Sequence, residues 1–336
     1  MGKNALPLVM VVVGAAAGCT PAPAKTVSPT TSTATTPPAS TGTVVITLGT
    51  RGGPMPSKER SQSSNLLIVK DKLYLIDAGD NVTRRIVQSG NDFTKAETIF
   101  LTHLHGDHTD GLATLVDSEW EYTHGESIDI YGSGIDKLIA GMTAYLAPNA
   151  EIRSATGKST PLSDIVHGHE VQDGVIYQDA NVKVIAAENT HFHFPPDSIP
   201  YGKYRSYAYR FETPDRVVVF TGDTGVSDAV TKLATGADVL VAEVGDPDAV
   251  IALAKKSGVW QKRPPAAQEA IARHLHEDHL AAEDLGKMAA AAGVKSVVMT
   301  HLVATVDPND TYQRYIDAAR KFYAGPIYIG QDLKRY

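Results

Sequence analysis

The most informative segment of the chain is Thr102-His103-Leu104-His105-Gly106-Asp107-His108, which follows an apolar run at residues 98–101. The run predicts a buried β-strand, and Gly106 is expected to let the chain turn so that the polar side chains converge from a loop. Three imidazoles and one carboxylate within six residues are more protein ligands than one catalytic tetrahedral ion uses, because such an ion keeps its fourth position for water. The segment therefore predicts two neighbouring metal ions with further ligands from elsewhere.

Candidates for the remaining ligands stand where later strands are expected to end. His191, Asp223 and His301 each follow an apolar run of this kind. Loops at strand ends are a usual place for functional residues, because the sheet beneath them is rigid. These three residues are therefore the first candidates to complete a two-metal site.

Apolar runs and alternating patterns divide the chain from Val44 onward into strands and helices. Strands linked by short turns and strands linked by helices both occur, which favours sheets covered by helices on their outer faces. No change of composition after Val44 marks a second domain. The predicted strands are 44–48, 65–69, 72–77, 98–102, 128–131, 182–186, 206–211, 217–221, 239–244, 296–300 and 327–329, and the predicted helices are 82–89, 136–146, 228–234, 265–273, 281–292 and 311–323.

The order of the motifs resembles the metallo-β-lactamase fold superfamily. The matching motifs are His103-x-His105-x-Asp107-His108, His191, Gly222-Asp223-Thr224 and Thr300-His301-Leu302. The resemblance implies an α/β fold over 44–336, an αββα sandwich of two mixed β-sheets flanked by helices. Segments at 49–61, 75–79, 237–243 and 330–333 are similar to the branch of ribonuclease Z, zinc-type arylsulfatases and cyclic-nucleotide phosphodiesterases, and residues 201–214 look most like the arylsulfatase-type members.

The resemblance also implies a role for each candidate ligand. His103, His105 and His191 would hold one metal, Asp107, His108 and His301 would hold the other, and Asp223 would bridge both. The implied cofactors are two Zn²⁺ ions, with Mn²⁺ or iron as alternatives. The implied reaction is attack by a metal-bridging hydroxide on a sulfate or phosphate ester. The superfamily's spacing favours His191 over His193 as the ligand after its strand.

Further residues are candidates for roles around the metals. His279, just before the predicted helix 281–292, matches the branch's histidine that faces the metals across the cleft. It would clamp an anionic oxygen or protonate the leaving group, and a simple helix cap is the alternative. Asp107 and His279 are thus the predicted catalytic residues. Asp77, at the end of a predicted strand, is interpreted equally as an acceptor that orients a ligand imidazole or as a strand-end cap.

A second segment, His274-Leu275-His276-Glu277-Asp278-His279, has nearly the pattern of the first. It follows a helix-like stretch instead of a strand, and it lacks the glycine. The sequence leaves no second bridging aspartate or distal histidine for another two-metal centre. We therefore interpret the likeness as chance, with His279 alone carrying a functional role and His276 as a weaker neighbour.

Several aromatic residues are candidates for a pocket that receives an aryl leaving group. Each has a core or loop-anchoring role as its equal alternative. These residues are Trp120, Tyr122, Phe192, Phe194, Tyr201 and Tyr204.

Together these features predict a zinc-dependent hydrolase of ester bonds, most similar to an arylsulfatase, with a small anionic ester as its partner. A small-molecule phosphodiesterase is the first alternative, and a lactonase or β-lactamase is the second. A surface lipoprotein that only binds a ligand is disfavoured, because every expected ligand position is filled. The formal net charge of −7 argues against nucleic-acid binding, and residues 132–173 contain no Gly/Pro-rich basic arm that would grip tRNA. A homodimer is left open.

The N-terminal residues predict export. Lys3 and the apolar run from Ala5 to Gly18 are typical of a signal peptide at residues 1–18, because the run is too short to span a bilayer. Ala16-Ala17-Gly18-Cys19 resembles a bacterial lipobox, with Cys19 as the lipidated residue. Residues 19–43, rich in Thr, Pro, Ser and Ala, predict a flexible tether. The expected location is the cell envelope, on its periplasmic face or at the cell surface, with the lipid as the only membrane contact.

Overall fold

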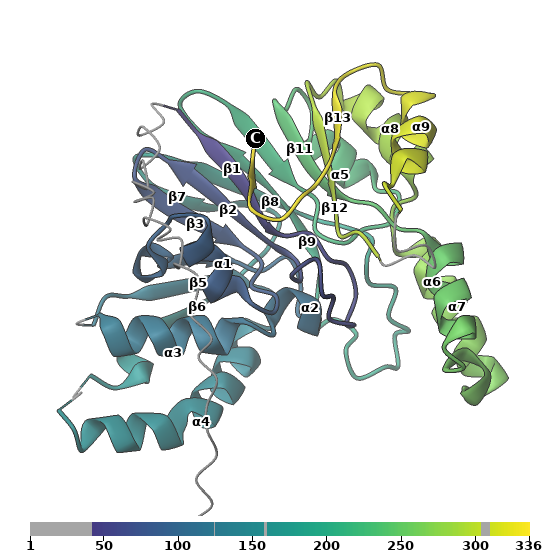
Figure 1. Cartoon of the computed structure of the whole chain (residues 1–336). Helices are drawn as coiled ribbons and strands as arrows, with labels where there is room; N and C mark the ends of the chain where they lie inside the picture. The colour runs from purple at the N-terminus through teal and green to yellow at the C-terminus, as the bar shows by residue number, and fades with distance from the viewer. Residues whose placement is uncertain (1–41, 124, 158–159, 304–309) are drawn as a thin grey trace, which may run out of the picture. The chain divides into compact units, whose positions relative to one another are not determined.

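Two mixed β-sheets lie face to face, and helices cover the outer face of each (Figure 1). This computed structural model describes residues 42–123, 125–157, 160–303 and 310–336, so the predicted lipidation site Cys19 lies outside the described residues. The layers confirm the predicted α/β fold, an αββα sandwich of two mixed sheets. In the ranges that the structure describes, no helix combines the length and the apolar character needed to cross a membrane.

The first sheet has the strand order β14-β1-β2-β3-β4-β5-β6. Neighbouring strands are antiparallel from β14 to β3 and parallel from β3 to β6. The strands are β1 (Val44–Gly49), β2 (Ser64–Val69), β3 (Lys72–Ile76), β4 (Thr98–Phe100), β5 (Ile128–Gly132), β6 (Val166–Glu170) and β14 (Lys334–Arg335).

The second sheet has the order β13-β12-β11-β10-β9-β8-β7 and repeats this division. Strands β7 to β10 are antiparallel neighbours, and β10 to β13 are parallel. The strands are β7 (Gly174–Gln178), β8 (Lys183–Glu188), β9 (Tyr207–Glu212), β10 (Val217–Phe220), β11 (Val239–Glu243), β12 (Val297–Thr300) and β13 (Ile327–Ile329).

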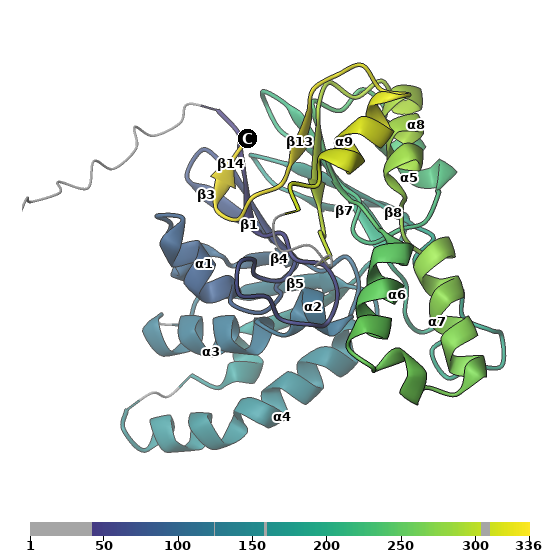
Figure 2. The same ribbon diagram turned by 45° about the vertical axis from the view of Figure 1, so that its right-hand side comes forward.

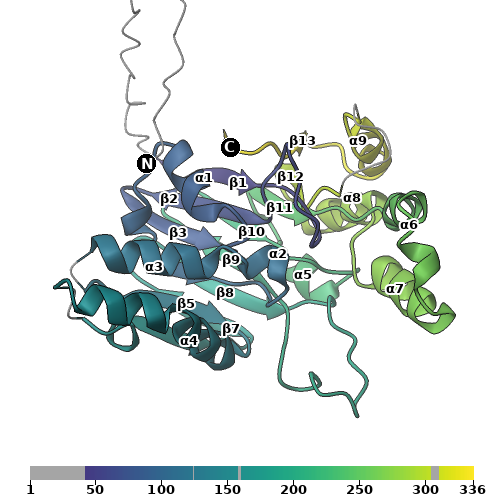
Figure 3. The ribbon, with the colours of Figure 1, turned by 60° about the horizontal axis from the view of Figure 1, so that its bottom comes forward.

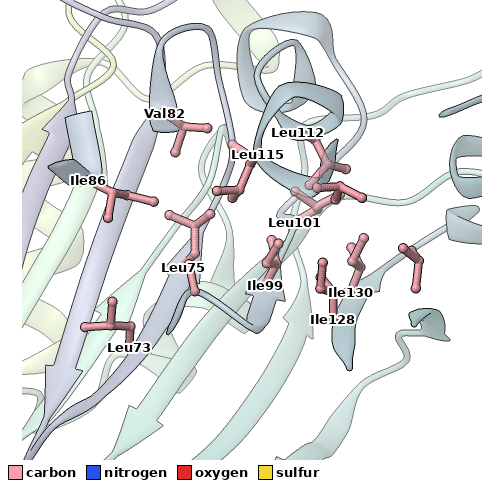
Figure 4. Close-up of a cluster of buried hydrophobic side chains, with 14 of the residues drawn as sticks. Leu73, Leu75, Val82, Ile86, Ile99, Leu101, Leu112, Leu115, Ile128 and Ile130 are labelled. Carbon is pink, nitrogen blue, oxygen red and sulfur yellow. The ribbon is translucent and has the colours of Figure 1, made fainter. Parts of the chain in front are cut away.

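The central strands are buried on both faces, which explains their continuous apolar sequences. In β3, Leu73 and Leu75 point toward the outer helices, while Tyr74 and Ile76 point into the layer between the sheets, as the alternation of a strand requires. Figure 4 shows the outer layer, where Leu75 lies beneath Leu115. The helices on this side are α1 (Val82–Gln88), α3 (Leu112–Tyr122) and α4 (Ile135–Ser154).

A second helical layer covers the other sheet (Figure 3). Leu285 and Met288 of this layer pack with Leu240 of β11. The helices are α5 (Asp228–Leu233), α8 (Ala282–Ala292) and α9 (Gln313–Arg320). Three short helices, α2 (Gly106–Thr109), η1 (Phe93–Lys95) and η2 (Leu162–Asp164), complete the connections of the first sheet.

A helical hairpin precedes the second histidine-rich segment. It consists of α6 (Pro247–Lys256), the 3-10 helix η3 (Trp260–Lys262) and α7 (Pro265–Glu277), and neither α6 nor α7 contains a buried residue. Figure 2 shows the two helices side by side beyond the end of the sheets. Because α7 ends directly before Asp278 and His279, this hairpin sets the position of those residues.

The predicted elements agree with the structure in the interior of both sheets and differ mainly at the edges. The sequence does not predict β6, β7 or β14; β6 and β7 are edge strands that are largely exposed, so they carry little apolar signal. It also misses α3 and α6, although Leu112, Leu115 and Val116 have helical spacing. Helix α4 continues past its predicted end at residue 146, because Pro148 removes a single backbone hydrogen bond without stopping the helix.

Candidate metal centre

All the predicted metal ligands come together at one edge of the sheets, each after the carboxyl end of a strand. Strands β8, β10 and β12 point in the same direction, because β9 is antiparallel to both β8 and β10, and β10 to β12 are parallel. His191, Asp223 and His301 follow these strands, while His103 to His108 follow β4 of the facing sheet. The parallel arrangement therefore gathers residues that are far apart in the sequence.

The turn after β4 differs from the prediction at Gly106. Gly106 does not have a positive φ angle; it begins α2, a single helical turn with His105 as its N-cap. A Cβ atom at this position would lie 2.9 Å from Oδ1 of Asp110. The backbone conformation here therefore does not require glycine, and a Cβ atom would press only on the side chain of Asp110.

His103, His105 and His191 form a three-histidine cluster. Nδ1 of His105 lies 3.0 Å from Nε2 of His103 and 3.1 Å from Nε2 of His191. The opposite nitrogens of two rings are held from outside: Nδ1 of His191 donates to the carbonyl of Asp278 at 3.0 Å, and Nδ1 of His103 lies 3.1 Å from Oγ1 of Thr102. The facing nitrogens are therefore oriented to share one cation.

Asp107, His108, Asp223 and His301 form a mixed cluster beside it, and all are buried. Nε2 of His301 lies 3.0 Å from Oδ2 of Asp223 and 3.2 Å from Oδ2 of Asp107. The same Oδ2 of Asp223 lies 3.9 Å from Nε2 of His103 and 4.0 Å from Nε2 of His191. Asp223 thus stands between the two clusters, where a bridging ligand is needed.

The mixed cluster has the features of a cation site. Nε2 of His108 and Oδ1 of Asp223 are buried 3.3 Å apart, yet neither has a hydrogen-bond partner among the described residues. Buried polar atoms are nearly always hydrogen-bonded, and the ion pair between these two leaves each with capacity for a further partner. A cavity of about 20 Å³ is lined by these residues together with Asp77, Glu243 and His301, which is room for one small ion or water. Imidazole and carboxylate donors around such a space fit zinc.

Burial and neighbouring charges divide the histidines into two kinds. Burial lowers the pKa of His191 to about 3 and holds that of His103 well below its ordinary value, so both present neutral imidazoles, the form that binds metal. Burial also acts to lower the pKa of His301, but Asp223 and Asp107 raise it to about 10. Burial acts to raise the pKa of Asp223, and His301 and His108 bring it well below its usual range. The carboxylates are therefore ionised.

Asp77 makes both of the contacts predicted for it. Its Oδ2 accepts a hydrogen bond from Nδ1 of His108 at 2.9 Å, and its Oδ1 accepts from the backbone N–H of Thr102 at 2.8 Å. The first bond orients the imidazole of His108 toward the mixed cluster, and the second ties the end of β3 to the end of β4. Asp77 thus couples the strand ends to the ligand geometry.

Glu243 is a site residue that the sequence analysis did not assign. It ends the apolar strand β11 and is buried; Oε1 accepts from the backbone N–H of Thr224, and Oε2 accepts from Nδ1 of His279 at 2.8 Å. The ring of His279 stacks on that of His301, with centroids 5.6 Å apart. Burial raises the pKa of Glu243. A charged residue closing an otherwise apolar strand was the available signal for this role.

The second histidine-rich segment lies at the same site, so His279 is not its only residue there, although the sequence had suggested that it was. The carboxylate of Asp278 accepts from Nδ1 of His274 at 2.7 Å and from Nδ1 of His193. His274, His279 and His191 present donor nitrogens close enough to be possible metal ligands themselves. His276 points elsewhere, and 52% of its side chain is exposed. The segment forms the rim of the first site and not a separate centre.

The aromatic candidates divide between a pocket and other roles. Phe192, Phe194 and Tyr204 line a pocket beside His105. Trp120 is buried in the core between α3 and the first sheet, so its pocket role is wrong. Tyr122 and Tyr201 are mostly exposed and outside the pocket lining.

The family of the chain follows from comparison with known proteins. A family model described as "Beta-lactamase superfamily domain" matches residues 73–302. The chain is 28% identical to ribonuclease Z of Mycobacterium sp. (strain KMS) over 295 residues, which cover 87% of this chain and 95% of the relative. It is 26% identical to ribonuclease Z of Bacillus velezensis, covering 83% and 94% of the two chains. The chain belongs to the metallo-β-lactamase superfamily, in its ribonuclease Z and phosphodiesterase branch.

Solved structures agree with this fold. The metallo-β-lactamase fold protein YhfI from Bacillus subtilis superposes with a TM-score of 0.61 at 17% identity, covering 88% of this chain and 98% of that one. Unliganded yeast PDE1 also has a TM-score of 0.61, at 14% identity and 88% and 99% coverage. The short form of human tRNase Z superposes with a TM-score of 0.57 at 20% identity, covering 87% of this chain and 98% of that one. The comparisons do not support the arylsulfatase-type resemblance; they favour the phosphodiesterase alternative.

Proposed function

We propose that this protein is a metal-dependent phosphodiesterase that acts on small substrates. The observation that carries the proposal is the position of Asp223, whose Oδ2 faces His103 at 3.9 Å and His301 at 3.0 Å. One carboxylate between two groups of donors suits a pair of cations, and such pairs serve in-line displacement at phosphorus. The relatives named ribonuclease Z support phosphodiesters over sulfate esters as substrates.

The residues around the clusters have separate tasks in this reaction. Bound at this site, two divalent cations would supply a nucleophilic water at neutral pH and positive charge beside the phosphoryl oxygens. His103, His105 and His191 would hold one cation, Asp107, His108 and His301 the other, and Asp223 both. The hydrogen bond that Nδ1 of His108 donates to Asp77 keeps the ring of His108 in its orientation.

His279 is placed to act on the leaving group. Glu243 holds its Nδ1 at 2.8 Å, which leaves Nε2 free to donate a hydrogen bond or a proton to an oxygen of the substrate. His279 is only 11% exposed at its side chain and lies against His191 and His301, with ring centroids 5.0 and 5.6 Å away. Its donor therefore adjoins both clusters.

Two features favour a small substrate over RNA. The formal net charge of −7 opposes the approach of a polyanion. Between β5 and β7, the described residues form α4, η2 and β6, of which α4 packs on the first sheet. The described residues of this part are thus folded against the sheet, and its sequence contains no Gly/Pro-rich basic arm that would grip tRNA.

The substrate class is tested with full-length protein loaded with zinc. We would compare kcat/KM for bis(4-nitrophenyl) phosphate, 4-nitrophenyl sulfate and a precursor tRNA with a 3′ trailer. The expected result is a preference of at least about tenfold, or ~1.4 kcal/mol in the barrier, for the phosphodiester over the sulfate, without cleavage of the tRNA. A higher kcat/KM for the sulfate ester would restore the arylsulfatase hypothesis. Efficient trimming of the tRNA would contradict the proposal that the substrate is small.

The role of His279 is tested by His279→Ala. Loss of a general acid costs roughly 10²–10⁴ in rate, while both metals should remain because His279 is not one of the seven predicted ligands. The loss should be larger for a phenyl than for a 4-nitrophenyl leaving group, since the better leaving group needs less protonation. Equal losses, or none, would remove His279 from the proton transfer. In Glu243→Gln a single amide oxygen replaces the two acceptors that serve Thr224 and His279, so this variant should show the same dependence on the leaving group with a smaller loss of rate.

We also propose that the protein is lipid-anchored at the cell envelope through Cys19. The support is the sequence around Cys19 alone. In a bacterial host, Cys19→Ala should move the protein from the membrane fraction to the soluble exported fraction. A membrane-bound variant would exclude lipidation at this residue.

A further inference from the structure

A cavity of about 340 Å³ adjoins the three-histidine cluster, and the proposed reaction does not use it. Its walls are mostly apolar or aromatic side chains, and His105 and Lys137 are its basic residues. We call it the aromatic pocket. Its lining residues are Leu104, His105, Gly134, Lys137, Leu138, Phe192, Phe194 and Tyr204.

Phe192 connects this pocket to the candidate metal ligands. Its ring meets those of His103 and His105 edge-on, with centroids 5.6 and 5.3 Å away, and it stacks on Phe194 at 4.7 Å. His105 belongs both to the pocket lining and to the three-histidine cluster. A group bound in the pocket would therefore begin directly beside the place where the phosphorus binds.

The opposite wall is built around a glycine. Gly134, the N-cap of α4, has a φ angle of 71°, and a Cβ atom there would lie 2.5 Å from Cδ1 of Tyr204. The ring of Tyr204 thus packs directly on the backbone of Gly134. The backbone N–H of Arg205 donates to Oγ of Ser133 at 3.2 Å, which ties the same loop to the start of α4. Two anchors hold this wall in place.

We propose that the aromatic pocket binds a planar aromatic group attached directly to the phosphoester oxygen, so that the substrates are aryl phosphodiesters; this inference rests on the proposed function. Aromatic side chains hold another ring by stacking and edge contacts worth about 0.5–1.5 kcal/mol beyond its buried area. A cavity of about 150 Å³ already holds benzene, so the pocket has room for a substituted ring.

An aryl ester fits better than a nucleotide because of where the pocket begins. In a nucleotide, a ribose separates the base from the phosphate. Here the apolar wall starts at Phe192, whose ring meets those of His103 and His105 edge-on, so the aromatic lining adjoins the cluster directly. Phe192, Phe194 and Tyr204 were among the residues predicted from the sequence for this task, and the structure brings them together.

The experiment measures binding, so that it does not depend on catalysis. Calorimetry on the full-length, zinc-loaded protein would give affinities for phenylphosphonate, cyclohexylphosphonate and methylphosphonate, which share one head group. We expect phenylphosphonate to bind at least about tenfold more tightly than methylphosphonate, which corresponds to ~1.4 kcal/mol, and more tightly than cyclohexylphosphonate. Equal affinities for the phenyl and methyl compounds would contradict the proposal that the pocket binds the ring. Equal affinities for the phenyl and cyclohexyl compounds would contradict a preference for aromatic groups.

Three variants locate the effect. Phe194→Ala removes a ring of the pocket wall that stacks on Phe192 and that belongs to neither metal-ligand cluster. Leu138→Trp fills the cavity. Both should reduce the phenyl-to-methyl ratio to about threefold or less, a loss of ~0.7 kcal/mol or more, while the affinity for methylphosphonate stays unchanged. Tyr122→Ala removes an aromatic ring that is 75% exposed on α3 and should leave the ratio as it is. An unchanged phenyl-to-methyl affinity ratio in both pocket variants would show that the ring does not bind in the aromatic pocket.

A second pair of compounds, with and without a nucleobase, tests whether the pocket binds an aryl group or a nucleobase. Adenosine 5′-monophosphate should gain little over ribose 5-phosphate, and a gain as large as that of phenyl over methyl would replace the aryl group with a nucleobase. Phenyl selectivity that persists in a protein without phosphodiesterase activity would refute the proposed function and leave the pocket standing.

Discussion

The first histidine segment, residues 103–108, and the second, residues 274–279, share the pattern His-Leu-His-x-Asp-His. The first leaves a strand and enters the single turn α2, so all four of its polar side chains reach the clusters. The second spans the end of helix α7. There His274 and Asp278, four positions apart, lie on one face and pair at 2.7 Å, whereas His276 points to solvent. The same residue types thus serve different tasks, because the first segment follows a strand and the second lies at the end of a helix.

The difference also separates ligands from the residues that support them. Asp107 of the first segment faces His301 within the mixed cluster. Its counterpart Asp278 offers its backbone carbonyl to His191 and its carboxylate to His193 and His274. The first segment would hold the cations, and the second holds the imidazoles around them.

The largest expected difference is between His105→Ala and His276→Ala, the corresponding positions of the two segments. His105→Ala removes a donor of the three-histidine cluster, so the bound zinc should fall from two per chain toward one, with turnover reduced by roughly 10³ or more, because the activated water is lost. His276→Ala should change neither quantity. Metal analysis together with bis(4-nitrophenyl) phosphate turnover provides the check. Equal effects of the two substitutions would contradict the division of tasks.

Chelation of the metals should lower thermal stability strongly. Buried carboxylates such as Asp107 and Asp223 then keep only neighbouring histidines as compensating charges, and a ligand present at about 100 times its Kd stabilises the native state by ~2.7 kcal/mol. The melting temperature of the wild type should fall on chelation and recover with zinc. In the Asp223→Asn variant, the difference in melting temperature with and without zinc should be much smaller. A melting temperature that ignores chelation would show that the first segment holds no metal in the folded protein.

A third comparison uses the two aspartates. Asp107→Asn should reduce zinc content, whereas Asp278→Asn keeps the backbone carbonyl that accepts from His191 and should leave zinc content intact. Asp278→Asn should still lower kcat by about tenfold, or ~1.4 kcal/mol, because His193 and His274 lose a charged acceptor. Asp278→Ala, which removes the acceptor altogether, should cost more than Asp278→Asn. If zinc is lost from Asp278→Asn, the rim is itself part of the metal site.

The smallest effect is expected for Glu277→Gly, which gives the second segment the glycine found at Gly106 in the first. Glycine near the end of α7 should cost about 1 kcal/mol in stability, seen as a small fall in melting temperature. Zinc content should stay at two per chain, since helix α7 and not residue 277 separates the segments. A third bound zinc would show that the glycine itself makes the difference.

The sequence by itself determined the apolar strands, the layered fold class and the seven candidate ligands, because each depends on local pattern: an apolar run makes a buried strand, and polar residues at its end mark a loop. It did not predict the edge strand β6, whose residues are mostly exposed, or distinguish the buried Trp120 from the pocket residue Phe192.

Only the tertiary structure decided which residues meet. Glu243 reaches His279, and Asp278 reaches His193, across 36 and 85 positions respectively. These contacts depend on the parallel order of β10, β11 and β12 and on the position of the hairpin α6–α7. Sheet order and helix packing are set by the burial of apolar surface over the whole domain, which no short stretch of sequence specifies.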